Sequence, residues 1–220
     1  MRTVVLVPWR AGNRQREWNW RVTQPHLERL GFPLFLGDRP GPWARAAACN
    51  EAAREAGAWD VALIADADTI GEPEVIHRAV RMVGDGAIRP HDVLYALNPA
   101  QSKILAQKGP LGVRLSPRQK TMLGGGLLVV SREAWERVGG YDERFIGWGH
   151  EDSALHTSLL AEAHWDRIPG RAWHLYHPRD NTQTLARLKN RQMMHEVQER
   201  YADVIARESE ERGWDIGAVL

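Results

Sequence analysis

The stretch Val61-Ala62-Leu63-Ile64-Ala65-Asp66-Ala67-Asp68 predicts the fold of this chain. Its apolar part lacks the alternation of a half-buried strand and is typical of a strand buried on both faces of a parallel sheet. Open α/β folds bind ligands at the carboxyl edge of such a sheet, which is where Asp66 and Asp68 stand. Two aspartates at this spacing suit a divalent cation held beside a diphosphate. Acids after a strand also serve as a solvated loop or a helix cap, and the tripeptide alone leaves both interpretations open.

The residues around this strand repeat the order strand, loop, helix. Apolar runs predict strands at residues 4–7, 33–36 and 61–65, and helical patterns alternate with them at residues 15–30, 43–56 and 72–83. Gly31 and Gly84 stand where two of these helices end, a usual place for glycine. Alternating strands and helices predict an α/β fold of Rossmann-like type, with a mainly parallel central sheet flanked by helices.

The second half of the chain is less regular. We expect strands at residues 93–97 and 127–130 and within 165–176, and helices at 131–138, 150–163 and 182–211, the last packing across the sheet. Residues 99–121 carry five Lys or Arg and no acid, and we expect a long loop without regular structure. Such a loop either holds phosphates or an anionic acceptor, or is simply a solvated basic loop.

Length and composition predict one globular domain over residues 1–220. A chain of 220 residues is long enough for one core and short for two. Within it we expect a nucleotide-binding half at 1–97, an acceptor and catalytic half at 98–180 and a C-terminal helical segment at 181–220. The net charge of +1 gives no general attraction to nucleic acid or anionic lipid. The ten tryptophans offer flat rings that either bind sugars or fill the core.

Cysteine content and hydropathy bear on the cellular location. Cys49 is the only cysteine, so no intrachain disulfide can form and a reducing compartment is expected. No apolar stretch approaches the roughly 20 residues that span a bilayer. We therefore expect no membrane span and a cytoplasmic protein.

Several short motifs occur in an order that resembles a known family. They are Pro8-Trp9-Arg10, Asp66-Ala67-Asp68, the glycine-led strand after Gly124, Trp148-Gly149-His150-Glu151-Asp152, and His174-Leu175-Tyr176-His177. This order resembles the nucleotide-sugar-dependent glycosyltransferases of the GT-A fold. The closest likeness is to the galactosyltransferase C-terminal family, which includes β-1,4-galactosyltransferases and chondroitin-synthase-like enzymes. The polypeptide N-acetylgalactosaminyltransferases resemble the chain less closely. The resemblance covers residues 3 to 190 and implies a single-domain GT-A fold.

The resemblance implies a metal site. It assigns Asp68 and His177 to the metal, while Asp66 faces the ribose or supports the site. His174 stands where the family has methionine, so it is either a second imidazole ligand or a surface residue. Imidazole ligands suit manganese better than magnesium, so we expect Mn²⁺, with Mg²⁺ as the other choice.

The resemblance also implies a catalytic segment. The aspartate of the family's Trp-Gly motif is the general base, and Asp152 stands at that position, with Glu151 beside it to hold sugar hydroxyls. Acids in the first turn of a helix also stabilise the helix by their charge, and the two roles are compatible. Trp148 would stack under the sugar or the acceptor.

The remaining candidate residues concern the nucleotide donor. Pro8 and Arg10 match the family's Pro-x-Arg, which contacts the base or the diphosphate, and Asp38 is a candidate for the uracil or the ribose. Arg45 and Asn50 would face the nucleotide from the next helix. Glycines without a side chain would let the backbone approach the donor sugar closely, and here these are Gly125 and Gly126.

These observations predict a metal-dependent glycosyltransferase that moves a hexose or N-acetylhexosamine from a UDP-sugar to a hydroxyl of a glycan, protein or small-molecule acceptor. Inversion is expected because an aspartate occupies the base position. Three alternatives stay open. They are a retaining enzyme of N-acetylgalactosaminyltransferase type, a sugar nucleotidyltransferase, and a non-catalytic module that binds sugar or nucleotide. Against the nucleotidyltransferase, residues 8–13 are a poor match to a glycine-rich basic phosphate loop.

Overall fold

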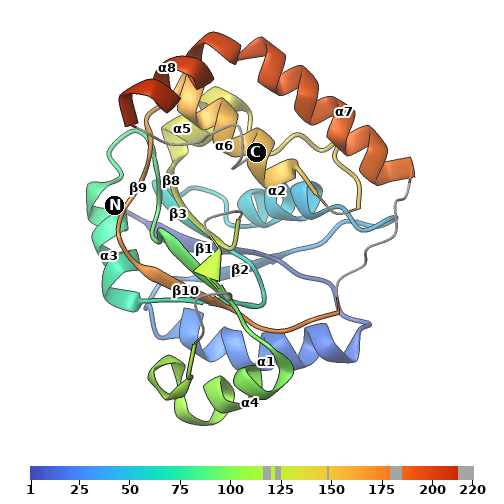
Figure 1. The fold of residues 1–220 in the computed structure, drawn as a ribbon, viewed down its shortest axis with the longest axis vertical. Coiled ribbons are helices and arrows are strands. Elements are labelled where there is room, and N and C mark those ends of the chain that lie inside the picture. The colour runs from blue at the N-terminus through green and yellow to red at the C-terminus, as the bar shows by residue number, and fades with distance from the viewer. Residues whose placement is uncertain (116–119, 122–124, 148, 179–184, 213–220) are drawn as a thin grey trace.

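A computed structural model describes the whole chain except residues 116–119, 122–124, 148, 179–184 and 213–220 (Figure 1). Helices cover both faces of a central sheet, with α1 on one side and α2, α5 and α6 on the other (Figure 1). The α/β architecture expected from the sequence, a central sheet flanked by helices, is therefore present.

The central sheet has six strands in the order β2-β1-β3-β8-β5-β9. Their bounds are Leu34–Gly37, Thr3–Pro8, Val61–Ala65, Leu127–Ser131, Ala87–Arg89 and Trp165–Arg167. β1 pairs in parallel with both β2 and β3, and β5 pairs in parallel with β9. β8 runs antiparallel to its neighbours β3 and β5. The sheet is therefore mostly parallel, as expected, and β8 is the strand that departs from the pattern.

Alternate residues of the strands enter two separate cores. Val4, Leu6, Ala62 and Ile64 face α2 (Arg45–Glu55), α5 (Arg132–Val138) and α6 (Glu151–Glu162). Their neighbours along the strands face α1 (Arg14–Glu28) and α3 (Pro73–Met82). All residues of β3 are buried, which confirms the prediction for Val61-Ala62-Leu63-Ile64-Ala65. The buried strand therefore holds the aspartates that follow it rigidly at the sheet edge.

A second, smaller sheet lies beside this edge. It has the order β4-β10-β6-β7, with bounds Thr69–Gly71, Arg171–His174, Val93–Ala96 and Lys120–Thr121. β10 pairs antiparallel with β4 and in parallel with β6, and β7 is antiparallel to β6. The sequence did not predict β4, β5 or β7, because strands this short carry too few residues to show a period.

The predicted loop at residues 99–121 is wrong over its first half. Pro99–Lys108 form α4, and Pro110–Gly112 form a short 3-10 turn, η1. The Asn98 side chain accepts a hydrogen bond from the backbone of Gln101, and the Gln101 side chain accepts one from the backbone of Asn98. This capping box and the proline at the start of the helix are local signals that the prediction overlooked.

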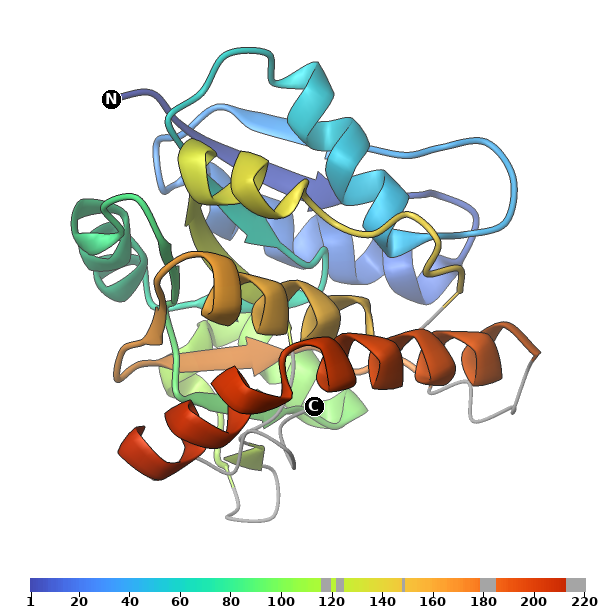
Figure 2. The ribbon, with the colours of Figure 1, turned by 90° about the horizontal axis from the view of Figure 1, so that it is seen from above.

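The C-terminal region is helical, as expected, but it forms two helices. α7 spans Leu185–Arg200 and α8 spans Ala202–Arg212. α7 lies along α6 rather than directly across the sheet, as Figure 2 shows. Within the described part of the chain, no helix is both long enough and apolar enough to cross a membrane.

Candidate active site

Three potential metal ligands meet at the edge of the second sheet. One carboxylate oxygen of Asp68 lies 3.6 Å from Nε2 of His174, and the other lies 3.7 Å from Nε2 of His177. One ligand atom from each residue fits within a span of 4.8 Å. Both separations exceed hydrogen-bond length. The three side chains therefore surround a common point instead of bonding to one another.

The strand pairing of the second sheet brings these residues together. Asp68 directly precedes β4, and His174 ends β10, where it stands opposite Thr69. The backbone N–H of Leu175 donates to the carbonyl of Asp68 at 2.8 Å, which extends the pairing past the strand end. His177 follows shortly afterwards along the chain. The antiparallel register of β4 and β10 thus positions side chains that are far apart in the sequence.

The side chains fit a divalent cation. In His177, Nδ1 lies 3.0 Å from the carbonyl of Pro178, so Nδ1–H donates to that oxygen and Nε2 is free to act as a ligand. A carbonyl that fixes the imidazole in this way is the usual support of a metal-binding histidine. Two ligands that are each about 2.1 Å from one ion lie about 3 Å apart at right angles and at most about 4.2 Å apart on opposite sides. The separations of 3.6 and 3.7 Å from Asp68 to the two imidazoles fall between these limits.

Next to this cluster, Arg45 of α2 bridges two carboxylates. Its guanidinium lies 2.6 Å from Oδ1 of Asp66 and 2.6 Å from Oδ1 of Asp152. The Arg45 side chain is only 11% exposed. Burial lowers the pKa of Arg45, but the charges of Asp152 and Asp66 outweigh it and hold that pKa well above its ordinary value. Burial also raises the pKa of Asp66 despite the attraction of Arg45. The three groups form one compact ion-pair cluster.

Two further groups complete the surroundings of Asp152. The hydroxyl of Tyr141 donates to Oδ1 of Asp152 at 2.8 Å. Glu151 is buried, and its carboxylate accepts a hydrogen bond from the backbone of Gly149 at 3.0 Å. Burial and the charge of Asp152 raise the pKa of Glu151 to about 7. Both acids stand in the first turn of α6. His150, which directly precedes this helix, has a left-handed backbone conformation with φ 73°.

The glycines before β8 leave room for these groups. A Cβ at Gly125 would lie 2.2 Å from Oδ2 of Asp152, and a Cβ at Gly126 would lie 3.1 Å from the Thr69 methyl. Gly126 also has φ 94°, which disfavours other residues. The backbone N–H of Asp66 donates to the carbonyl of Gly126 at 2.8 Å. Both glycines thus lie between the metal cluster and Asp152.

The residues predicted to bind the nucleotide from the loops after β1 and β2 interact with each other in the structure. Pro8 ends β1 and pairs with Gly37 of β2. The Arg10 guanidinium lies 2.6 Å from the Asp38 carboxylate. The Arg10 hydrogen bond holds the pKa of Asp38 below its ordinary value. This pair joins the loops that follow β1 and β2. Its role toward a nucleotide stays a prediction.

The Asn50 side chain binds the backbone of Tyr141. The Asn50 side chain donates to the carbonyl of Tyr141 at 2.9 Å and accepts from the Tyr141 N–H at 3.0 Å. Asn50 and Arg45 therefore both hold protein groups, and their predicted nucleotide contacts remain untested. Trp148, the predicted stacking plate, lies outside the described residues.

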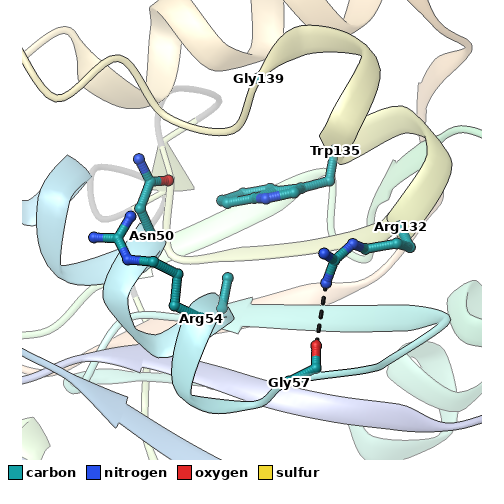
Figure 3. A pocket seen from close by; sticks show the side chains of 7 residues that line it. Asn50, Arg54, Gly57, Arg132, Trp135 and Gly139 are labelled. Carbon is teal, nitrogen blue, oxygen red and sulfur yellow. Dashed lines mark hydrogen bonds between the residues drawn. The ribbon is translucent and has the colours of Figure 1, made fainter.

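A separate cavity of about 410 Å³ opens on the far side of Asn50. Figure 3 shows the Trp135 ring in its wall, with Asn50 and Arg54 toward one side and Arg132 toward the other. Arg54 pairs with Glu51 and Glu143, and Arg132 pairs with Glu136. The acids balance the two guanidinium groups, so the cavity carries no strong excess of positive charge.

Comparison with known proteins bears on the family. A family model described as the N-terminal domain of galactosyltransferase matches residues 114–179, which include Asp152 and both histidines of the metal cluster. Residues 114–179 thus resemble the galactosyltransferases, and the chain has the GT-A fold. A search of the curated proteins finds no match.

Solved structures of glycosyltransferases share the fold of this chain. A mutant β1,4-galactosyltransferase 7 from Drosophila, in complex with manganese, UDP-Gal and xylobiose, has a TM-score of 0.59 at 16% identity, over 86% of this chain and 78% of that one. The catalytic domain of the same Drosophila enzyme with xylobiose has a TM-score of 0.57 at 18% identity, over 88% and 79%. GalNAc-T7 with UDP, GalNAc and Mn²⁺ has a TM-score of 0.52 at 14% identity, over 90% and 41%.

The residues that surround Asp152 are the part of the site that the sequence did not predict. It singled out Arg45 for the nucleotide and gave Tyr141 no role. The only signal for Tyr141 was its place in Gly139-Gly140-Tyr141-Asp142, directly after the helix end at Gly139.

Proposed function

We propose that the chain is a metal-dependent glycosyltransferase that moves a hexose or N-acetylhexosamine from a UDP-sugar to an acceptor hydroxyl, with inversion and with Asp152 as general base. The observation that carries this proposal is the meeting of Asp68, His174 and His177 beside the carboxylate cluster that contains Asp152. A glycosyltransferase of this kind has to stabilise the leaving diphosphate and to deprotonate the acceptor hydroxyl. Asp68 belongs to the metal cluster and Asp66 to the ion-pair cluster with Asp152, so the Asp66-Ala67-Asp68 tripeptide connects the two clusters.

The metal cluster would serve the leaving group. Asp68, His174 and His177 would hold Mn²⁺, which when bound neutralises the diphosphate as a Lewis acid. Mixed carboxylate and imidazole ligands favour manganese over magnesium. Manganese is also present with UDP-Gal in the Drosophila galactosyltransferase and with UDP in GalNAc-T7. Those ligands support the proposal through the shared fold.

Asp152 would serve the acceptor. The acceptor oxygen forms a bond to the anomeric carbon while the bond from that carbon to the diphosphate oxygen breaks. The acceptor proton passes to the Asp152 carboxylate, and the electron pair of the broken bond leaves with the diphosphate. A carboxylate is a sufficient base because the proton becomes more acidic as the new bond forms. Glu151, whose pKa of about 7 leaves it partly protonated at neutral pH, can donate or accept a hydrogen bond to a sugar hydroxyl.

The loops after the first strands would bind the nucleotide. Arg10 is held by Asp38 at the carboxyl edge of the central sheet, where open α/β folds bind ligands. Its hydrogen bond with Asp38 raises the pKa of Arg10, so the guanidinium is charged at every working pH. Asp38 balances this charge, so Arg10 would recognise a diphosphate or a uracil carbonyl through hydrogen bonds from its fixed guanidinium.

Binding and turnover test this proposal separately. Thermal unfolding is measured with UDP, UDP-galactose, UDP-glucose and their N-acetyl forms, with and without Mn²⁺, because a ligand that binds the folded state raises the melting temperature. UDP release is then measured with water and with a panel of aryl glycosides as acceptors. We expect a manganese-dependent shift and manganese-dependent release of UDP from at least one donor.

Asp152→Asn should keep the thermal shift and lose the release of UDP. Asp203→Asn is the matched control, because Asp203 also stands in the first turn of a helix, α8, but away from the cluster. A helix-stabilising role alone would make the two variants alike. No manganese-dependent shift and no turnover with any donor would refute the proposal. Proton NMR of the product then shows whether the anomeric configuration is inverted, and retention would remove Asp152 from the base role.

A further inference from the structure

We propose that Tyr141 and Arg45 orient the general base. They hold one oxygen of the Asp152 carboxylate, Oδ1, so that the other oxygen, Oδ2, which lies against Gly125, takes the acceptor proton. This inference rests on the proposed function, since it assigns positioning residues to the base that the proposed reaction needs.

The two residues and the carboxylate form a closed triangle of hydrogen bonds. Arg45 donates to Oδ1 of Asp152 at 2.6 Å and to the Tyr141 oxygen at 2.9 Å, and the Tyr141 hydroxyl donates to Oδ1 at 2.8 Å. A phenol has one proton to donate. Because Tyr141 accepts from Arg45, that proton is directed at Asp152. Oδ1 thus receives two strong donors and is the less basic of the two oxygens.

The other oxygen packs against Gly125. A Cβ at position 125 would lie 2.2 Å from Oδ2 of Asp152, which is far inside contact distance. Only glycine at this position therefore allows Oδ2 to lie where it does. Across the residues that the structure describes, no hydrogen bond reaches Oδ2. Gly125 precedes β8 on the side of the metal cluster, since the next residue, Gly126, contacts Thr69 of β4. Among the hydrogen bonds of the described residues, Oδ2 is therefore the oxygen of Asp152 that is left to accept a proton, on the side of Gly125.

The backbone around Tyr141 is held firmly enough to fix its hydroxyl. The Asn50 amide pairs with both backbone groups of Tyr141, at 2.9 and 3.0 Å. Gly140 permits this approach, because a Cβ there would lie 2.8 Å from the Trp135 ring and 2.9 Å from the Asn50 oxygen. Asn50 and Arg45 both belong to α2. One helix thus supports the phenol from its backbone and its hydroxyl at once.

The charges around Asp152 keep the arrangement stable near neutral pH. Burial and then the charge of Asp152 raise the pKa of Tyr141 well above its ordinary value, so the phenol stays a donor. Burial lowers the pKa of His156, on the same helix, to about 4, so this imidazole is neutral. The described groups that face Asp152 are Arg45 and Cys49 from α2, Asp66 after β3, Tyr141 before α6, and Glu151 and His156 on α6.

Tyr141→Phe tests the inference because it removes one hydroxyl and leaves the ring. UDP release from the best UDP-sugar of the donor screen is measured in Mn²⁺ as a function of pH. We expect kcat to fall about tenfold, which is part of the roughly 10²–10⁴-fold that a positioned general base contributes. The donor KM and the manganese-dependent thermal shift should stay within about twofold of the wild type. The acid side of the pH profile should move upward, because the charged carboxylate has lost a donor.

Tyr201→Phe is the matched control, since its hydroxyl also donates to a carboxylate, that of Glu162, at 2.9 Å. It should leave kcat and the pH profile unchanged. Gly125→Ala is a second variant that leaves Tyr141 intact and places a methyl group against Oδ2. It should lower kcat and spare the thermal shift with UDP and Mn²⁺.

The outcomes separate this inference from the proposed function. Turnover that disappears in Asp152→Asn but is unchanged in both Tyr141→Phe and Gly125→Ala would leave the proposed function standing and overturn the inference. A fall in kcat with an unmoved pH profile in Tyr141→Phe would also overturn it, because a purely structural role predicts that pattern. Absence of turnover in the wild type with every donor would remove the proposed function itself.

Discussion

Replacing Arg45 by methionine should leave two carboxylates without the guanidinium that they now share. Methionine keeps most of the length of the side chain and removes its charge. Asp66 and Asp152 each lie 2.6 Å from Arg45, and their side chains are 22% and 21% exposed. Neither carboxylate is free to turn fully into water, because Asp66 follows a buried strand and Asp152 stands in the first turn of a helix.

The size of the effect follows from this burial. Removal of one partner of a fully buried ion pair costs about 3–5 kcal/mol of folding free energy, because the other charge is left uncompensated. The carboxylates of Asp66 and Asp152 retain about a fifth of their exposure, so water compensates part of that loss. We therefore expect Arg45→Met to cost about 3 kcal/mol at neutral pH, the low end of the range.

Urea denaturation at pH 7.5, followed by tryptophan fluorescence, measures this cost. The control is Arg54→Met on the same helix, because Arg54 also pairs with two carboxylates, of Glu51 and Glu143, but is 53% exposed. Exposed ion pairs contribute about 0–1 kcal/mol. The two variants thus share residue type, helix and number of partners, and differ in burial.

A second measurement isolates the charge. Asp152→Asn added to Arg45→Met removes one of the two uncompensated carboxylate charges. The double variant should therefore be more stable than Arg45→Met alone. Equal destabilisation by Arg45→Met and Arg54→Met, or a double variant less stable than Arg45→Met, would refute the reasoning from burial and charge.

Three further predictions concern the metal site, the buried acid and the cysteine. His174→Ala and His177→Ala should each weaken Mn²⁺ binding more than about tenfold in calorimetry, because even the loss of a residue that only supports a metal ligand costs that much. His195→Ala is the control, since the His195 side chain is exposed. Wild-type Mn²⁺ affinity in either test variant would remove that histidine from the ligand set. The pKa of Glu151 is raised from 4.5 to about 7 by burial and Asp152, so the folded state favours its protonated form. The unfolding free energy of the wild type relative to Glu151→Gln should therefore fall by about 3 kcal/mol as the pH rises from about 4.5 to about 7 and stay constant above, and a flat difference would contradict this. Cys49 is fully buried and burial raises the pKa of its thiol, so an aromatic disulfide reagent should label it only in denaturant, and rapid labelling of the folded protein would contradict the structure.

Local patterns were sufficient where one element decides its own structure. The run Val61-Ala62-Leu63-Ile64-Ala65 predicted a buried strand because burial on two faces requires an unbroken apolar sequence. The short helix from Arg132 was predicted from its ends, and the structure shows Ser131 accepting from the Ala134 N–H and Gly139 in the left-handed conformation. Both ends depend on bonds between neighbours in the sequence, which a sequence pattern can represent.

Interactions between distant segments required the structure. The β4 strand is short, and its pairing with β10 depends on side chains and backbone contributed by segments about a hundred residues apart in the chain. The resemblance to a family named Asp68 and His177, but their approach to one point follows from that register.

The sequence by itself determined the alternation of strands and helices, the position of the two aspartates at the end of a buried strand, and the motifs that resemble a glycosyltransferase. Only the tertiary structure decided that Arg45 binds Asp66 and Asp152, and that Tyr141 holds the same carboxylate. The physical reason is that a helix pattern shows which face is apolar and gives no information on which charge a buried arginine will meet. That partner is chosen when separate elements pack and a buried charge has to be compensated.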